Sequence, residues 1–159
     1  MRTSLRPLTG TASQVYDPDM RIDEVVRRKG HEVVTIRSDA TVGELIELLE
    51  KHRIGAVVVS DGEGRVDGIV SERDLVRLVR EDGAGARKVV EVMTREVFTC
   101  GPKDELETIA ATMTAQRVRH LPVVQDGVLV AIVSIGDVVK NRLDELQTER
   151  DQIERYVRG

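Results

Sequence analysis

Two serine–aspartate pairs are the residues of this chain that could do chemistry. Ser71 and Asp74 follow the apolar run GIV, and Ser134 and Asp137 follow AIV 63 residues later. At the start of a helix such residues cap free backbone N–H groups, which stabilises the helix by about 1 kcal/mol and needs no ligand. A carboxylate at the mouth of a cleft can instead accept both hydroxyl hydrogens of a ribose, and a serine beside a helix N-terminus favours phosphate. One copy alone favours capping, and the presence of two copies at matched positions raises the question of a ligand.

These pairs lie inside an internal repeat that covers most of the chain. Residues 33–60 align with residues 97–124 at an offset of 64, so that Thr35 matches Thr99 and Arg53 matches Arg117. The offset falls to 63 at the next turn, because SDGEGRVDG (residues 60–68) is one residue longer than VQDGVLVA (residues 124–131). The match extends over too many positions to be a coincidence.

Each copy predicts the element order β-α-β-β-α. A short strand (32–36 or 96–100) precedes an amphipathic helix whose apolar residues recur at i, i+3, i+4 and i+7. Two apolar strands follow, joined by an Asp-Gly turn, and a second helix begins at Asp74 or Asp137. One copy is too small to bury its own sheet, so we expect an α+β fold in which two repeats pack about a pseudo-twofold axis. The predicted boundaries are a flexible tail (1–19), a first repeat (20–80) that begins with the lead-in MRIDEVVRRKG, a linker (81–90), a second repeat (91–143) and a C-terminal helical extension (144–159).

The composition narrows the classes of protein. Of the 159 residues, 40 % are hydrophobic but only 2 % are aromatic, so the core must consist of Val, Ile and Leu. The net charge of −4 does not suggest the basic face that nucleic-acid binders carry. No apolar run approaches the ~20 residues of a membrane helix, and the N-terminus lacks the apolar segment of a signal peptide. We therefore expect a soluble cytoplasmic protein that binds neither nucleic acid nor membrane.

Catalytic and metal chemistry are not predicted. His31, His52 and His120 are scattered without metal-ligand spacing, and the sequence contains neither a phosphate loop nor a GxGxxG motif. Cys100 is the only cysteine, which excludes an intrachain disulfide and a thiolate metal cluster. We expect Cys100 to be buried and inert. The sequence therefore predicts a protein that is not an enzyme.

The repeat resembles a tandem pair of cystathionine-β-synthase (CBS) domains, also called a Bateman module, of the stand-alone type. The resemblance is carried by HRIGAVVVSDGEGRVDGIVSERDL, by QRVRHLPVVQDGVLVAIVSIGDV and by VMTREVFT, and it covers about residues 20–143. It implies two clefts and a regulatory module that binds adenosine-containing ligands and signals to a partner protein. AMP is the favoured ligand, with ATP, ADP, NAD and S-adenosylmethionine as alternatives, and no cofactor is required. The competing hypothesis is a structural or interaction protein whose clefts are vestigial.

The resemblance also implies a role for individual residues. Asp74 and Asp137 would bind ribose hydroxyls, and Ser71 and Ser134 would bind phosphate. Each apolar residue of the adenine slots could equally be plain core. The expected slots are Val34, Ile54 and Ile69 in one cleft and Phe98, Val118 and Ile132 in the other, with Thr35 and Thr99 beside them.

The two clefts are not expected to be equivalent. The second copy has Arg119 and His120 where the first has Gly55 and an alanine, at a position that faces the phosphates in many family members. Arg119 carries a permanent charge, whereas His120 is charged only when protonated. Arg73 has no counterpart, because the second copy has Gly136 there. A solvated surface position is the plain alternative for Arg73.

A long helix is predicted at the C-terminus. Residues 138–158 contain neither Gly nor Pro, and Leu143, Leu146, Ile153 and Val157 follow a 3-4 spacing that Arg150 interrupts. The helix could cover the module's own apolar surface, pair with a second copy or bind a partner. Because Bateman modules commonly associate in pairs, the resemblance implies a disc-like homodimer.

Overall fold

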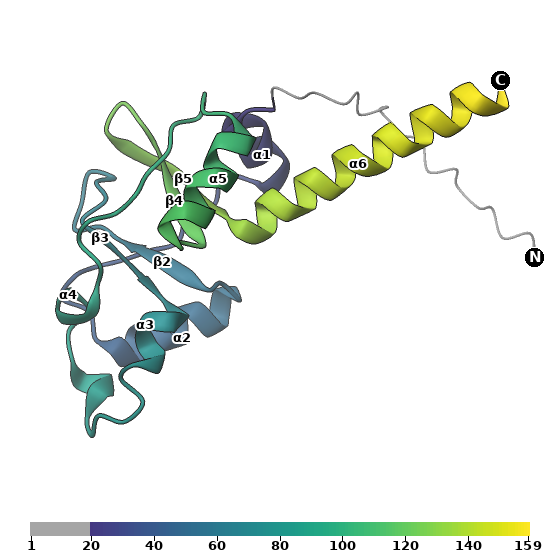
Figure 1. Ribbon diagram of the computed structural model, residues 1–159. Coiled ribbons are helices and arrows are strands. Elements are labelled where there is room, and N and C mark those ends of the chain that lie inside the picture. Colours follow the sequence, from purple (N-terminus) through teal and green to yellow (C-terminus); the bar gives the residue numbers. More distant parts are fainter. Residues whose placement is uncertain (1–19) are drawn as a thin grey trace, which may run out of the picture.

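The computed structural model describes residues 20–159, so the expected tail (1–19) lies outside the described residues. A lead-in helix comes first, and the order helix, strand, strand, helix then occurs twice along the chain (Figure 1), preceded by a short strand in the first copy alone among residues 20–159. The first part of the chain forms α1 (Ile22–Lys29), β1 (Thr35–Ile36), α2 (Val42–His52), β2 (Ala56–Val59), β3 (Gly68–Ser71) and α3 (Glu72–Val76). The second part forms η1 (Ala84–Ala86), α4 (Val89–Val92), α5 (Leu106–Gln116), β4 (His120–Gln125), β5 (Val128–Ser134) and α6 (Ile135–Arg158).

Each copy is built on a small sheet. In the first copy β1 runs parallel to β2, and β2 pairs antiparallel with β3. In the second copy β4 and β5 form an antiparallel pair. The expected strand 96–100 is reduced to one parallel bridge between Cys100 and Val123, so its position was predicted correctly but its length was wrong. Cys100 is bonded to Pro122 and Val124 of β4, and Pro122 has no N–H group with which to extend the ladder toward residue 96.

The helices α2 and α5 bury the apolar positions that the periodicity predicts. Leu45 and Leu49 in α2, and Ile109 and Met113 in α5, are at most 5 % exposed. Ile46 is the exception, because 42 % of it is exposed. The buried stripe of α2 is therefore narrower than predicted.

Each hydrophobic core takes its lead-in helix from the other part of the chain. Ile22 and the other buried residues of α1 pack in the core of the second copy, whereas Val89 of α4 packs in the core of the first. Backbone hydrogen bonds fix both exchanges, from Leu106 N to the Met20 carbonyl (2.9 Å) and from Val89 N to the Ala40 carbonyl (2.9 Å). The lead-in 20–30, which the sequence predicted as part of the first repeat, thus packs against the second.

The C-terminal helix α6 is continuous across the predicted boundary at residue 143. Its first half contacts α1, α5 and β5, where Val138, Asn141 and Glu145 are buried. Its second half projects away from the two sheets (Figure 1). The helix therefore belongs to the module at one end and is exposed at the other.

Candidate functional site

A cavity of about 320 Å³ lies between the two copies, and we call it the Asp74 cleft. One wall comes from β2, β3 and α3, and the other comes from residues 94–98 and from the junction of α5 with β4. This cleft brings together more than half of the residues predicted from the sequence. They are Gly55, Ile69, Ser71, Arg73, Asp74, Phe98, Val118, Arg119 and His120.

The remaining predicted residues lie outside this cleft. Val34 and Ile54 pack against the first core, and Thr99 is exposed. Thr35 lines a separate hollow. The last three are on β5 and at the start of α6, and they are Ile132, Ser134 and Asp137.

The structure groups the slot residues differently from the expectation. Ile69 shares a cavity with Phe98 and Val118 of the other copy, and not with Val34 and Ile54 of its own. The cleft lies between the copies, so each copy contributes different residues to one site. The order of residues in the sequence could not indicate that Ile69 shares a cavity with residues of the other copy.

Ser71 and Asp74 form the first of the two repeated pairs, at the junction of β3 and α3. Asp74 Oδ2 accepts hydrogen bonds from the Ser71 backbone N–H (2.8 Å) and from Ser71 Oγ (3.0 Å). Within residues 20–159, Oδ1 of Asp74 accepts no hydrogen bond and the carboxylate makes no ion pair. The pair therefore caps the helix through one oxygen and leaves the other available to a ligand.

Four arginine side chains line the Asp74 cleft. Arg73 and Arg77 come from α3 and its C-terminal end, and Arg117 and Arg119 come from the segment after α5. None of the four guanidinium groups has a hydrogen bond or ion pair within the described part of the chain. Three carboxylates, including Asp74, line the same cavity, so the arginines exceed them by one. The cleft can accept an anion without breaking an existing ion pair.

His120 does not add to this positive charge near neutral pH. Burial is the main reason why the pKa of His120 lies below its ordinary value, and the positive charge of Lys29 adds to the effect. Asp137 and Glu72 act in the opposite direction but do not compensate. A neutral imidazole can still donate one hydrogen bond and accept another.

The second repeated pair is already occupied by a side chain of the protein. Asp137 Oδ2 accepts from Ser134 N (2.8 Å) and Oγ (3.0 Å), just as Asp74 does from Ser71. It also accepts from Lys29 Nζ at 2.7 Å, and the same ammonium donates to the Ile132 carbonyl at 3.0 Å. Burial by itself would raise the pKa of Asp137. The hydrogen bond and charge of Lys29, with the bonds from Ser134, outweigh burial and hold the pKa below its usual range.

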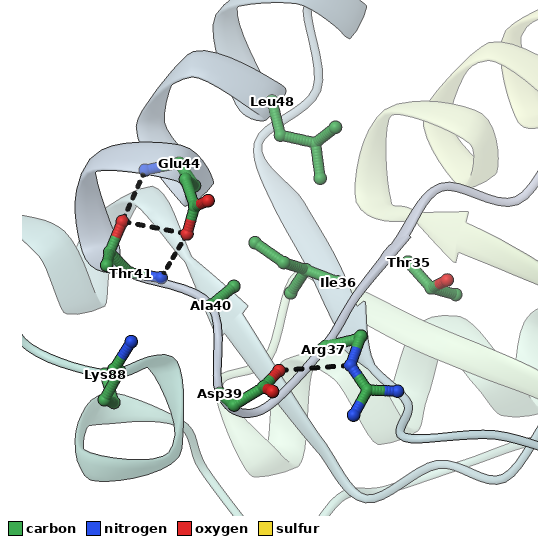
Figure 2. A pocket seen from close by; sticks show the side chains of 9 residues that line it. All are labelled: Thr35, Ile36, Arg37, Asp39, Ala40, Thr41, Glu44, Leu48 and Lys88. Atoms are coloured by element: carbon green, nitrogen blue, oxygen red, sulfur yellow. Dashed lines mark hydrogen bonds and ion pairs between the residues drawn. The ribbon is translucent and has the colours of Figure 1, made fainter.

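A larger hollow of about 610 Å³ lies over β1 and the start of α2. Figure 2 shows that most of its polar groups bind one another. Glu44 Oε2 accepts from the Thr41 backbone N–H at 2.7 Å, and Arg37 pairs with Asp39 at 3.1 Å. These contacts cap α2 and close a turn, so the hollow does not offer the free groups that the Asp74 cleft does.

Other reactive groups do not form a second site. Cys100 is buried as expected, and burial, with the nearby Asp104, raises the pKa of its thiol to about 12. Within residues 20–159, no cluster of three His, Cys, Asp or Glu side chains could hold a metal ion. In the same part of the chain, no helix has the length and apolar character needed to cross a membrane.

Several residues of the two sites were not predicted. Arg77 lies four residues after Arg73, a helical spacing that could have indicated it. Arg117 matches Arg53 in the repeat, and both end a helix with positive φ, of 54° and 53°. Lys29 is not part of any motif, so no feature of the sequence marks it.

A family model for the CBS domain matches residues 22–81 and again residues 89–144. The chain belongs to the CBS-domain family. The tandem resemblance and the α+β fold of two CBS repeats with a C-terminal helix are thus confirmed.

Known proteins resemble this CBS pair over most of its length. The crystal structure of the CBS-domain-containing protein ATU1752 from Agrobacterium tumefaciens is 41 % identical, with a TM-score of 0.73, and the match covers 77 % of this chain and 99 % of that one. The mitochondrial CBS-domain-containing protein CBSX3 of Arabidopsis thaliana is 32 % identical over 87 % of this chain and 72 % of its own length. The CBS pair of protein MJ0100, solved with 5′-methylthioadenosine and S-adenosyl-L-methionine, has the same fold. It is 22 % identical with a TM-score of 0.73, and the match covers 80 % of this chain and 99 % of that one.

Proposed function

We propose that this CBS pair is a non-catalytic sensor that binds an adenosine-containing nucleotide in the Asp74 cleft and signals to a partner protein. The observation that carries the proposal is the available Oδ1 of Asp74 in a cavity that also offers an apolar wall and four guanidinium groups without partners among residues 20–159. The adenosine-based ligands of the MJ0100 pair support the ligand class. The volume of about 320 Å³ is at the lower end of small-molecule pockets, which span about 300–1,000 Å³.

Each part of a nucleotide has a counterpart in the lining of the cleft. The ribose hydroxyls would donate to Asp74, whose remaining oxygen is the acceptor that they need. The adenine would lie against the apolar side chains of Ile69 and Val118. The phosphates would then lie toward the arginine side chains, of which Arg119 was predicted and Arg117 was not. Because guanidinium groups bind phosphate oxygens in pairs of hydrogen bonds, four of them favour more than one phosphate.

The positive charge of these four arginines favours ligands with more phosphates than AMP, the ligand that the sequence analysis favours. We expect affinity to increase from adenosine to AMP and again to ADP or ATP, and the increments to shrink at high salt. Isothermal titration of the purified protein with adenosine, AMP, ADP, ATP, NAD and S-adenosylmethionine tests this order. Absence of heat with every ligand, from a protein shown to be folded, would instead support a structural protein with vestigial clefts.

A matched pair of arginines isolates the phosphate contact. Arg117→Ala is expected to weaken ATP binding by about 10-fold, the equivalent of one charge-assisted hydrogen bond, and to leave adenosine binding unchanged. Arg53→Ala is the control, because Arg53 ends α2 with the same positive φ but lies outside the Asp74 cleft. Equal effects of the two substitutions would mean that Arg117 acts only through the helix end.

The assembly and the location are proposed on the same basis. We expect a homodimer of CBS pairs that changes its arrangement when nucleotide binds, since a ligand with different affinities for two states shifts their populations. The protein partner is unidentified. A cytoplasmic location stays a prediction from the sequence.

A further inference from the structure

The two repeated aspartates differ in one respect, which is the contact with Lys29. The Lys29 ammonium lies 2.7 Å from Asp137 Oδ2 and 3.0 Å from the Ile132 carbonyl oxygen. The Lys29 and Asp137 side chains are 37 % and 20 % exposed, so the ion pair is partly shielded from water. Among residues 20–159, no cation reaches Asp74 in this way.

The exchange of the lead-in helices explains why only one aspartate is covered. Lys29 is the last residue of α1, and α1 packs on the second copy, beside β5. The corresponding helix α4 is shorter and ends at Val92, so the chain beyond it meets β3 through its backbone. There, Thr94 N donates to the Ile69 carbonyl at 2.9 Å, and Ile69 matches Ile132 in the repeat. The Ile132 carbonyl thus accepts from the Lys29 ammonium, whereas the matching Ile69 carbonyl accepts from a backbone N–H group.

We infer that Lys29 is a built-in occupant of a latent second nucleotide site, so that the chain binds one nucleotide, at Asp74. The inference rests on the proposed function, because it assumes that the Ser-x-x-Asp pairs bind ribose. The ammonium binds Oδ2 of Asp137, the oxygen that also accepts from Ser134, and Oδ1 accepts no hydrogen bond among residues 20–159. Its positive charge lies beside the carboxylate to which ribose hydroxyls would donate, so we expect the ammonium to compete with a ligand for this side chain.

The stoichiometry of ATP binding tests the inference. We expect one ATP per chain in the natural protein, two in Lys29→Ala, and one again in Lys29→Ala combined with Asp74→Ala. Lys88→Ala, which removes an exposed lysine from the other lead-in, is the control and should leave the stoichiometry at one. Two sites in the natural protein, or one site in Lys29→Ala, would overturn the inference and leave the proposed function intact. Absence of binding by every variant would overturn both.

A second measurement needs no nucleotide. Acylation of lysine amines, followed by mass spectrometry, should find Lys29 slower to react than in the Asp137→Asn variant, because the ion pair holds its ammonium. Lys51 and Lys103, which are exposed, serve as internal references that should not change. Equal reactivity of Lys29 in the two proteins would show that the ion pair does not form in solution.

An independent observation concerns the outer face of α6. Val139, Leu143, Leu146, Ile153 and Val157 are between 45 % and 77 % exposed. With Arg150 they follow spacings of 4, 3, 4, 3 and 4 residues, which is the a/d pattern of a two-stranded coiled coil. This apolar stripe is separate from the face of α6 that buries Val138, Asn141 and Glu145 against the module.

Charge indicates how two such stripes would pair. In a parallel pair, Arg150 would face the partner's Arg150, and Glu149 would face the partner's Glu154. In an antiparallel pair centred on residue 148, Leu143 lies opposite the partner's Ile153 and Val139 opposite the partner's Val157. Lys140 then lies beside the partner's Glu154 on both sides of the pair, and Arg150 lies opposite a leucine. Antiparallel pairing thus removes the contact between the two Arg150 side chains and the contacts between Glu149 and Glu154, and it adds two attractive contacts of Lys140 with Glu154. The like-charge contact that it retains is the one between the two Glu149 side chains.

We propose, from this second observation, that α6 pairs antiparallel with α6 of a second copy. Leu143→Glu should halve the mass of the assembly in multi-angle light scattering, whereas Gln152→Glu, outside the stripe, should not. An unchanged mass in Leu143→Glu would overturn the proposal and leave the disc-like contact as the source of any dimer.

Disulfide cross-linking tests the orientation. Leu143→Cys and Ile153→Cys proteins should cross-link when mixed, and neither should cross-link efficiently alone. The native Cys100 is buried and does not interfere. Cross-linking of each variant with itself would indicate parallel helices and overturn the antiparallel arrangement.

Discussion

Asp74→Ala is expected to weaken nucleotide binding by about 100-fold. Its Oδ1 is the acceptor available for ribose in the Asp74 cleft, and a hydrogen bond to a charged group contributes about 1.5–3 kcal/mol. Loss of two such bonds, reduced by water that fills the space, corresponds to about 3 kcal/mol, or two orders of magnitude in the dissociation constant. Titration calorimetry with the tightest ligand of the nucleotide series measures the effect.

Asp137→Ala separates binding from helix capping. Both aspartates accept from their serine at 2.8 and 3.0 Å, so each substitution removes the same two hydrogen bonds to serine. The loss of capping should lower stability by about 1 kcal/mol in each case, and Asp137→Ala additionally loses the ion pair with Lys29. Only Asp74→Ala should also lose the nucleotide. Full binding by a destabilised Asp74→Ala protein would show that Asp74 serves the helix alone.

The local structure of this protein could be predicted from its sequence because each copy repeats the same periodicities. Leu45 and Leu49, like Ile109 and Met113, are buried as their spacing indicates. The Ser-x-x-Asp pairs stand at helix starts, where short polar residues are needed by the backbone. Periodicity and capping depend on residues close together in the sequence, so they predict each helix correctly whichever copy the helix packs against.

The arrangement between copies could not be predicted in this way. Two similar lead-ins and two similar sheets allow each lead-in to pack on either sheet, and only the tertiary structure shows that α1 packs on the second. For the same reason Ile69 was grouped with Ile54, although it lies in one cavity with Val118. The contact of Lys29 with Asp137 depends on this exchange, which is why no motif revealed it.

The packing of each lead-in helix on the other copy predicts which copy a core substitution will destabilise. Ile22 is fully buried in the core of the second copy, and Ile→Ala at such a site costs about 2–5 kcal/mol. Ile22→Ala should therefore lower hydrogen-exchange protection mainly in α5, β4 and β5 of the second copy, although Ile22 lies at the start of the first copy in the sequence. Hydrogen exchange read by mass spectrometry locates the loss.

Val89→Ala is the matched substitution in the other lead-in. Val89 is fully buried in the core of the first copy, so protection should fall in α2, β2 and β3, upstream of the substituted residue. If each substitution instead weakened the copy that follows it in the sequence, the exchange of lead-ins would not exist in solution. Because α1 brings Lys29 to Asp137, Ile22→Ala should also loosen that ion pair and raise the reactivity of the Lys29 amine. Val89→Ala should not, since α4 does not contribute to the second site.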